Sequence, residues 1–120
     1  MNAHEDELCT ALHLMSNDGH LNIVRLLINC GANIDSQNDE QETSLGLASY
    51  FGHLEIMRFL IKKGATVSAL DEEGNTPFHY AAYRGHLHVM KFLLEFGINV
   101  NIWNIYGRMP LYLASRNRNL

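Results

Sequence analysis

The chain has 120 residues, of which 47% are hydrophobic and 18% charged, and its formal net charge is −4. This length allows one domain with a buried core. The negative charge argues against a nucleic-acid binder that relies on overall positive potential, so we expect no nucleic-acid partner. No apolar run approaches the roughly 18 residues of a membrane span, so we expect no direct membrane insertion.

A block of 33 residues repeats along the chain. Two patterns carry the period, the tripeptide Gly-His-Leu and a later single Gly. They begin at Gly19, Gly52 and Gly85, and at Gly31, Gly64 and Gly97. A fixed period in this range indicates stacked supersecondary units. We therefore expect a single domain over residues 1–120, with units at about 5–37, 38–70 and 71–103 and a partial unit at 104–120.

The first unit begins in an acidic stretch that lacks the positive and apolar regions of a signal peptide. By analogy with the later units, Cys9 would precede a helix as an exposed thiol, and Cys30 would end one. Two isolated thiols at different repeat positions predict no disulfide and fit a reducing compartment. A cytoplasmic localisation is expected, with the nucleus left open.

The second unit departs from the third in its turn and first helix. Ser44 stands where the third unit has a proline, and Gly46 lies in a predicted helix, where it costs roughly 1 kcal/mol relative to Ala. Gln41, and Leu8 in the first unit, occupy the turn position that Gly74 holds in the third. Neither residue readily takes a positive φ. We expect these two turns to be altered or strained, and the second unit's first helix to be soft.

The third unit predicts its helices most clearly. Thr76 is a good N-cap and Pro77 suits the first helical position. Gly85 can end this first helix in a left-handed conformation. The second helix begins near Leu87, is apolar around much of its circumference, and ends at Gly97, so neighbouring units should cover it on both sides.

Small residues recur in the first helices, as Ala48-Ser49, Ala81-Ala82 and Ala114-Ser115. A thin first helix beside a thick second helix makes each unit a wedge. Stacked wedges curve, so the first helices should line a concave face.

The pattern resembles the ankyrin repeat family. The resemblance is carried by Asp71, Gly74, Thr76-Pro77-Phe78-His79, Ala81-Ala82, Gly85-His86, Val89, Leu93-Leu94, Gly97 and Val100. In less complete form it extends from about Glu5 to Leu120. It implies an all-α solenoid of L-shaped units, in which short hairpin-like turns project at right angles to paired antiparallel helices. It also implies that partners bind these turns and the exposed face of the first helices.

Enzyme and metal-site patterns are absent from the sequence, including C-x-x-C, H-E-x-x-H, phosphate loops and G-x-S-x-G. His20, His53 and His86 would lie about 10 Å apart in stacked units, whereas zinc ligands converge to about 2 Å from one ion. They cannot share a metal. We expect no enzyme, no cofactor and no metal, with His13 and His79 as framework residues that hydrogen-bond near an N-cap.

Acidic residues concentrate at the turns, and basic residues in the second helices. The acidic group is Glu5, Asp6, Glu7, Asp39, Glu40, Glu42, Asp71, Glu72 and Glu73, and the basic group is Arg25, Arg58, Lys62, Lys63 and Lys91. Stacking would produce an acidic ridge and a weakly basic back. Two interpretations stay open: the polar turns of any soluble protein, or an electrostatic guide for a basic partner segment.

The contact positions implied by the resemblance give the candidate partner-binding residues. They are Asp39, Glu40, Glu42, Tyr50, Phe51, Glu72, Glu73, Asn75, Tyr83, Arg84, Tyr106 and Arg108, with Asp6, Glu7, Cys9, Asn17 and Asp18 in the first unit and Ile105, Arg116 and Asn117 in the fourth. Tyr50, Phe51 and Tyr83 could form an aromatic anchor or could pack across the repeat interface. The expected function is non-enzymatic binding of a protein or peptide, a basic segment among the candidates.

The unfinished fourth unit leaves two alternatives open. The chain would be a targeting or regulatory segment of a larger enzyme or membrane protein if the sequence continues beyond Leu120. Alternatively, an uncapped last helix would support self-association through Ile102, Trp103, Leu111 and Leu113.

Overall fold

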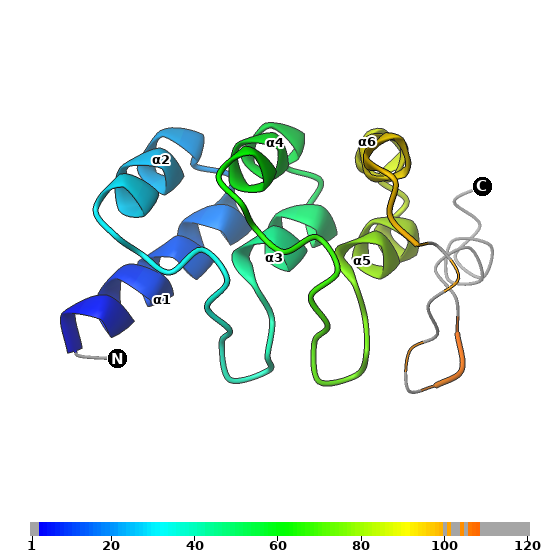
Figure 1. Ribbon diagram of the computed structural model, residues 1–120, viewed down its shortest axis with the longest axis horizontal. Helices are drawn as coiled ribbons and strands as arrows, with labels where there is room; N and C mark the ends of the chain where they lie inside the picture. Colours follow the sequence, from blue (N-terminus) through cyan, green and yellow to red (C-terminus); the bar gives the residue numbers. More distant parts are fainter. Residues whose placement is uncertain (1–2, 100, 102–103, 105, 109–120) are drawn as a thin grey trace.

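The computed structural model describes residues 3–99, 101, 104 and 106–108. Within them lie six helices: α1 (Ala3–Asp18), α2 (Leu21–Asn29), α3 (Ser44–Tyr50), α4 (Leu54–Lys62), α5 (Pro77–Arg84) and α6 (Leu87–Phe96). They stand as three pairs side by side (Figure 1). The described residues contain no strand, so the predicted all-α solenoid is confirmed. None of these helices is long and apolar enough to cross a membrane.

The pairs form two rows of helices (Figure 1). The first helices α1, α3 and α5 make one row, and the second helices α2, α4 and α6 make the other. The loops that lead into α3 and α5 extend beyond the first row as hairpins, on the side away from the second row. This is the L-shaped unit that the resemblance implies.

Helix α5 shows how local sequence sets the ends of a first helix. The Thr76 Oγ accepts a hydrogen bond from the His79 backbone N–H, and the His79 Nδ1 accepts one from the Thr76 N–H at 3.0 Å. This reciprocal cap satisfies two N–H groups that a helix start leaves unpaired. Pro77 follows the cap, and Gly85 ends the helix with a φ of 74°. The predictions for this helix are confirmed.

The hydrophobic core runs between the two rows of helices. Leu12, Leu45 and Phe78 share one repeat position on the first helices, and each is buried. Leu60 and Leu93, which share a position on the second helices, are also buried. Because neighbouring units fill the same positions, the core is continuous along the stack.

The small residues of the first helices let these helices pack closely. Ala48 and Ser49 of α3 and Ala81 and Ala82 of α5 are buried. Helix α3 packs extensively against both α1 and α5, whereas α2 and α4 are in less extensive contact. The units are therefore wedges of the predicted kind, narrow at the first helix, and such wedges curve a stack toward its first helices.

The first unit differs from the prediction because α1 begins at Ala3 and takes in the whole expected turn. Leu8 lies within the helix, and Cys9 is buried there instead of being an exposed thiol before a helix. A short Asn or Asp side chain closes each later turn, and the equivalent residue here is Glu5. Without that closure the chain stays helical, so the acidic residues 5–7 lie on a helix and not on a hairpin.

Several predictions concern residues outside those that the structure describes. They are the last helix, the self-association residues Ile102, Trp103, Leu111 and Leu113, and the contact positions Ile105, Arg116 and Asn117. Cys30, by contrast, is described: it ends α2, as predicted, and it is exposed.

Candidate protein-binding face

Three turns of like construction carry the candidate contact residues. They begin at Asn38, Asp71 and Asn104, and we call them the second, third and fourth fingers, after their repeat units. In each finger the first residue's side-chain oxygen accepts two backbone N–H groups, from two and four residues further on, at 2.8–3.0 Å. A backbone hydrogen bond across three residues closes the same turn. Such side-chain bonds fix a turn locally, so the fingers hold their contact residues at regular spacing.

The second finger has Gln41 where the third has Gly74. Gln41 takes a φ of 62°, and it alone among the described non-glycine residues has a positive φ. The left-handed region costs a residue with a Cβ roughly 1–2 kcal/mol. The predicted strain in this turn is confirmed, and the two bonds to the Asn38 side chain help to hold it.

The second and third fingers bring carboxylates together. The Glu72 N–H donates to the Glu40 carbonyl at 3.4 Å and so joins the two fingers. Asp39, Glu40 and Glu72 are exposed, while Glu42 and Glu73 are half-buried. Carboxylates gathered on one edge give that edge a negative potential.

Tyr80 of α5 is a site residue that sequence reasoning missed. Its hydroxyl donates to the Asp71 carboxylate, and its ring meets the Tyr50 ring edge-on, with centroids 6.0 Å apart. Burial, this hydrogen bond and the nearby carboxylates raise the pKa of the Tyr80 phenol far above its ordinary value. The signal in the sequence was a tyrosine at the repeat position that Leu47 fills in the second unit.

A cavity of about 290 Å³ lies where α5 meets the third and fourth fingers. Its described lining is Tyr50, Tyr80, Tyr83, Tyr106, Glu73, Asn75, His79, Asn104 and Arg108. Phenol rings from three successive units thus meet around one carboxylate. Apolar surface with a few convergent polar groups is the usual character of a binding site.

A second hollow of about 250 Å³ extends toward the second finger. It shares Tyr50, Tyr80, Glu73 and Asn75 with the first cavity, and its further lining is Glu40, Glu42, Asp71 and Glu72. We call the two hollows together the tyrosine–carboxylate site. It brings together nine of the twelve main candidate residues: Glu40, Glu42, Tyr50, Glu72, Glu73, Asn75, Tyr83, Tyr106 and Arg108.

The three aromatic residues singled out in the sequence do not act as one group, either as an aromatic anchor or as packing across the repeat interface. Tyr50 is half-buried between α3 and α5, with the Arg84 guanidinium 4.9 Å from its ring centroid, so it packs across the repeat interface. Tyr83 is 45% exposed and lines the cavity, as an anchor requires. Phe51 is 40% exposed and stacks on His53, and it lines neither hollow of the site.

Three of the candidate residues, Tyr106, Arg108 and Asp39, lie toward the ends of the candidate protein-binding face. Tyr106 of the fourth finger is 59% exposed, and a hydrogen bond to Glu73 raises the pKa of its phenol. The Arg108 guanidinium lies 5.5 Å from the Tyr106 ring centroid. Asp39 lies apart from them, in a different hollow beside His13 of α1.

Two of the periodic histidines, His53 and His86, connect neighbouring units. The His53 Nε2–H donates to the Asn17 carbonyl at 2.9 Å, and the His86 Nε2–H donates to the Tyr50 carbonyl at 2.8 Å. Each histidine thereby satisfies a carbonyl at the end of the preceding unit's first helix, where no intrahelical donor remains. In the described residues no three His, Cys, Asp or Glu side chains are grouped so that they could hold a metal ion.

The two framework histidines behave differently. His79 bonds at the N-cap of its own helix, as predicted. The prediction for His13 was wrong, because its Nε2 lies 2.8 Å from the Ser36 carbonyl, in the loop before the second finger. Helix α1 continues through this region and has no cap there for His13 to join.

Helix pairs in two rows with projecting fingers define a repeat protein of the helical solenoid class. Comparison with protein-family models gives matches to ankyrin repeats (many copies) over residues 8–61, 47–94 and 84–120. The chain belongs to the ankyrin repeat family. A comparison with curated proteins gives no match. Ankyrin repeats generally serve as protein–protein interaction modules and are typically non-enzymatic.

Proposed function

We propose that this protein is a non-enzymatic adaptor that binds a protein or peptide segment on the face formed by the fingers and the first helices. The supporting observation is the convergence of Tyr50, Tyr80 and Tyr106, from three successive units, on one hollow beside Glu73. Rigid aromatic side chains around a pocket are the groups that dominate binding energy at protein interfaces. The segment would lie along the tyrosine–carboxylate site.

The chemistry of the site favours a segment with an Arg or Lys side chain. A guanidinium or ammonium group can stack on a tyrosine face and pair with a carboxylate at the same time. Two rings of the site already carry cation–ring contacts with the chain's own guanidinium groups, Arg84 on Tyr50 and Arg108 on Tyr106. An incoming cation would lie against the exposed Tyr83 ring and pair with the Glu73 carboxylate, both of which line the hollow.

The test compares two variants of this site with two matched controls. Tyr83→Ala and Glu73→Gln alter the site, whereas Leu94→Ala and Glu95→Gln make the same kinds of change on α6, in the other row. Wild-type protein and each variant serve as bait for affinity capture with quantitative mass spectrometry, and the dissociation constant of each captured protein is then measured directly. Circular dichroism melts check that every variant is folded.

We expect a captured protein to bind Tyr83→Ala and Glu73→Gln at least about tenfold more weakly than wild type, the scale of an interface hot spot. The Leu94→Ala and Glu95→Gln baits should retain it. Replacing the Arg and Lys residues of the captured segment by Gln should weaken binding by a similar factor. Unchanged affinity in Tyr83→Ala, or an equal loss in the α6 controls, would show that the partner binds elsewhere. Tyr50→Ala is a poorer probe, because Tyr50 is half-buried against Tyr80.

A further inference from the structure

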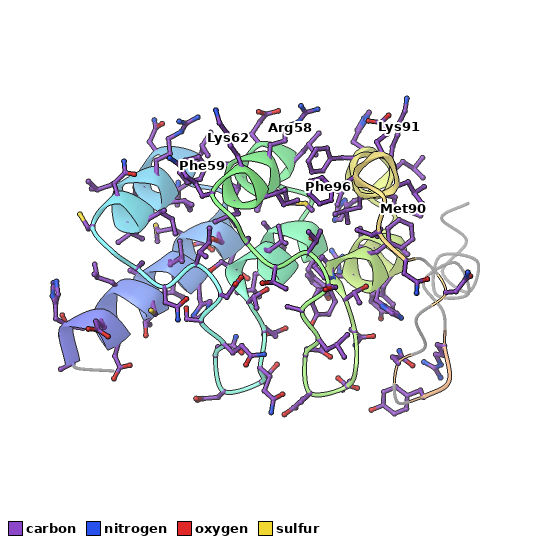
Figure 2. The ribbon with its side chains drawn as sticks, in the orientation of Figure 1. Arg58, Phe59, Lys62, Met90, Lys91 and Phe96 are labelled. Atoms are coloured by element: carbon purple, nitrogen blue, oxygen red, sulfur yellow. The ribbon has the colours of Figure 1, made fainter. Side chains whose placement is uncertain are left out.

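The row of second helices carries a basic hollow on the side of the molecule away from the fingers. Arg58, Lys62 and Lys91 stand along this row (Figure 2). A cavity of about 300 Å³ lies between α2 and α4, and Arg25, Arg58, Lys62 and Lys63 are among its lining residues. We call this cavity the α2–α4 basic groove. It shares no lining residue with the tyrosine–carboxylate site.

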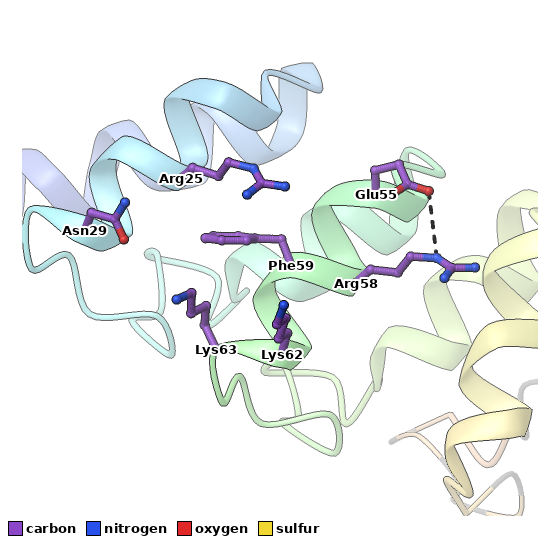
Figure 3. A pocket seen from close by; sticks show the side chains of 7 residues that line it. All are labelled: Arg25, Asn29, Glu55, Arg58, Phe59, Lys62 and Lys63. Atoms are coloured by element: carbon purple, nitrogen blue, oxygen red, sulfur yellow. Dashed lines mark ion pairs between the residues drawn. The ribbon is translucent and has the colours of Figure 1, made fainter.

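Phe59 organises the cations of this groove. Phe59 is 8% exposed and belongs to the buried core cluster. The Arg25 guanidinium lies 4.9 Å from the ring centroid and the Lys63 Nζ lies 5.8 Å from it. Figure 3 shows Arg25 reaching over the ring from α2, with Lys63 at the end of α4. Contact of two cations with one buried ring restrains side chains that would otherwise move freely in solvent.

The groove has an excess of positive charge. Glu55 is the one carboxylate among its described lining residues, and it pairs with Arg58 at 3.8 Å (Figure 3). Four cations against one carboxylate leave a local charge of about +3 in a chain whose net charge is −4. Arg25, Lys62 and Lys63 are exposed, so their charges face solvent and can meet an anion.

The arrangement of these cations distinguishes between anionic ligands. Figure 3 shows the basic side chains spread around Phe59 from two helices, with Arg58 turned toward Glu55. A single phosphate group is bound best by donors that converge on one point. Several carboxylates along an extended chain can each meet one cation, and Asn29 at the rim can hydrogen-bond to the backbone of that chain.

We propose that the α2–α4 basic groove is a second interaction surface, which binds an extended acidic segment of a partner protein. Because this surface lies on the opposite row of helices from the proposed finger site, it would allow the module to hold two partners of opposite charge at once. Exposed ion pairs are screened by salt, so binding here is weaker and more salt-dependent than binding at the aromatic site.

The test uses a short labelled peptide of alternating Glu and Ser, with a Gln–Ser peptide of the same length as its control. Fluorescence anisotropy measures the affinity of each peptide for the whole chain at low and at raised salt. Three variants are compared: Arg25→Gln, Phe59→Leu, and Lys91→Gln on α6, which removes one positive charge outside the groove. Phe59→Leu keeps every charge and removes the ring that restrains Arg25 and Lys63.

We expect the Glu peptide to bind at least about tenfold more tightly than the Gln peptide, and less tightly as salt rises. Arg25→Gln should weaken binding by about tenfold, the usual effect of losing a charge-assisted hydrogen bond, and Phe59→Leu should weaken it several-fold. Lys91→Gln should change it by less than about twofold. Circular dichroism checks the folding of Phe59→Leu, and Arg25→Gln tests the proposal without relying on that variant.

Four outcomes would overturn the proposal. Equal losses in Arg25→Gln and Lys91→Gln would mean that charge acts diffusely and that the groove is not a site. Inorganic phosphate that displaces the peptide at equal concentration would indicate an anion site for a single group. Tighter binding of a single-stranded oligonucleotide would indicate a nucleic-acid surface. Salt-sensitive self-association in sedimentation, lost in Arg25→Gln, would make the acidic fingers of a second copy the occupant.

Discussion

The Tyr80 ring fills the space beside Gly46, and a Cβ on residue 46 would lie 3.0 Å from the Tyr80 Cε2. The two residues lie on neighbouring first helices, α3 and α5. From the sequence alone, Gly46 is predicted to weaken its helix, because glycine lowers helix stability. In the fold it makes room for the ring that donates a hydrogen bond to Asp71 and lines the tyrosine–carboxylate site.

Gly46→Ala should have opposite effects on stability with and without Tyr80. In wild type, the clash with the restrained ring should exceed the gain in helix propensity, so the free energy of unfolding should fall by about 0.5–1 kcal/mol. In a Tyr80→Leu background the same change should raise it by up to about 1 kcal/mol. A double-mutant cycle by urea denaturation measures the coupling. Equal effects in the two backgrounds would show that the contact with Tyr80 does not determine the need for glycine.

Gln41→Gly should stabilise the second finger. Glycine accepts the φ of 62° without the cost that a Cβ brings there. Part of the gain is offset by the greater freedom of glycine in the unfolded chain, so we expect a net rise of about 0.5 kcal/mol in the free energy of unfolding. The matched control, Glu40→Gly in the same turn, should give no gain, because Glu40 does not have a positive φ. Thermal and urea melts measure both variants.

Gly52→Ala should be far more damaging than Gly64→Ala. Both glycines have a positive φ, 74° and 96°, so alanine at either position would bring the left-handed cost of about 1–2 kcal/mol. A Cβ on Gly52 would also lie 2.7 Å from the His86 Nδ1, whereas nothing lies within 4 Å of one on Gly64. The His86 ring is held by its bond to the Tyr50 carbonyl, so we expect a further loss of about 2 kcal/mol in Gly52→Ala.

The comparison becomes specific when His86 is removed. In a His86→Ala background, Gly52→Ala should cost no more than Gly64→Ala, because only the backbone strain is left. A persistent difference in that background, measured by urea denaturation, would assign the damage at residue 52 to something other than the histidine contact. His86→Ala alone should cost about 1 kcal/mol for the lost hydrogen bond.

Tyr80→Phe should flatten the loss of stability at alkaline pH. The pKa of Tyr80 is raised in the folded protein, chiefly by burial and then by its hydrogen bond to Asp71, while the unfolded chain has a pKa of about 10. The folded state therefore favours the neutral phenol. That stabilisation is complete below about pH 10 and is lost as pH rises above the unfolded value toward the folded pKa.

The measurement is the free energy of unfolding by urea from neutral pH to beyond pH 10. Wild type should lose stability more steeply than Tyr80→Phe in the alkaline range, and Asp71→Asn should lie between them because it removes one cause of the raised pKa. At neutral pH, Tyr80→Phe should cost about 1 kcal/mol for the hydrogen bond. Parallel alkaline slopes in wild type and Tyr80→Phe would contradict the burial of this phenol.

Features that depend on near neighbours in the chain were predicted correctly. The Thr76 cap, the Pro77 start, the Gly85 end and the strained turn at Gln41 all involve interactions across a few residues. A sequence motif specifies such interactions directly, because both partners are within it. The 33-residue period also gives the order of the units, because it too is a pattern along the chain.

Features in which one unit departs from the repeat pattern, or which depend on contacts between units, were predicted less well. The start of α1 at Ala3 was missed, because the alignment of repeats implied a turn that the first unit lacks the side chain to close. Tyr80 was missed because its hydroxyl, in a position filled by Leu47 in the preceding unit, pairs with Asp71, a residue of its own finger nine positions away. Tyr50 proved to be part of an interface, with Tyr80 and Arg84 from the next unit against it.

The sequence by itself determined the repeat, the helices apart from the start of α1, and the acidic fingers and basic second helices of the later units. These follow from periodicity and local capping, which act within one unit. Only the tertiary structure decided that Gly46 makes room for Tyr80, that His53 and His86 bond across units, and that tyrosines from three units surround Glu73. Those relations join groups from neighbouring repeat units, and the distance between such groups is set by the packing of neighbouring helices.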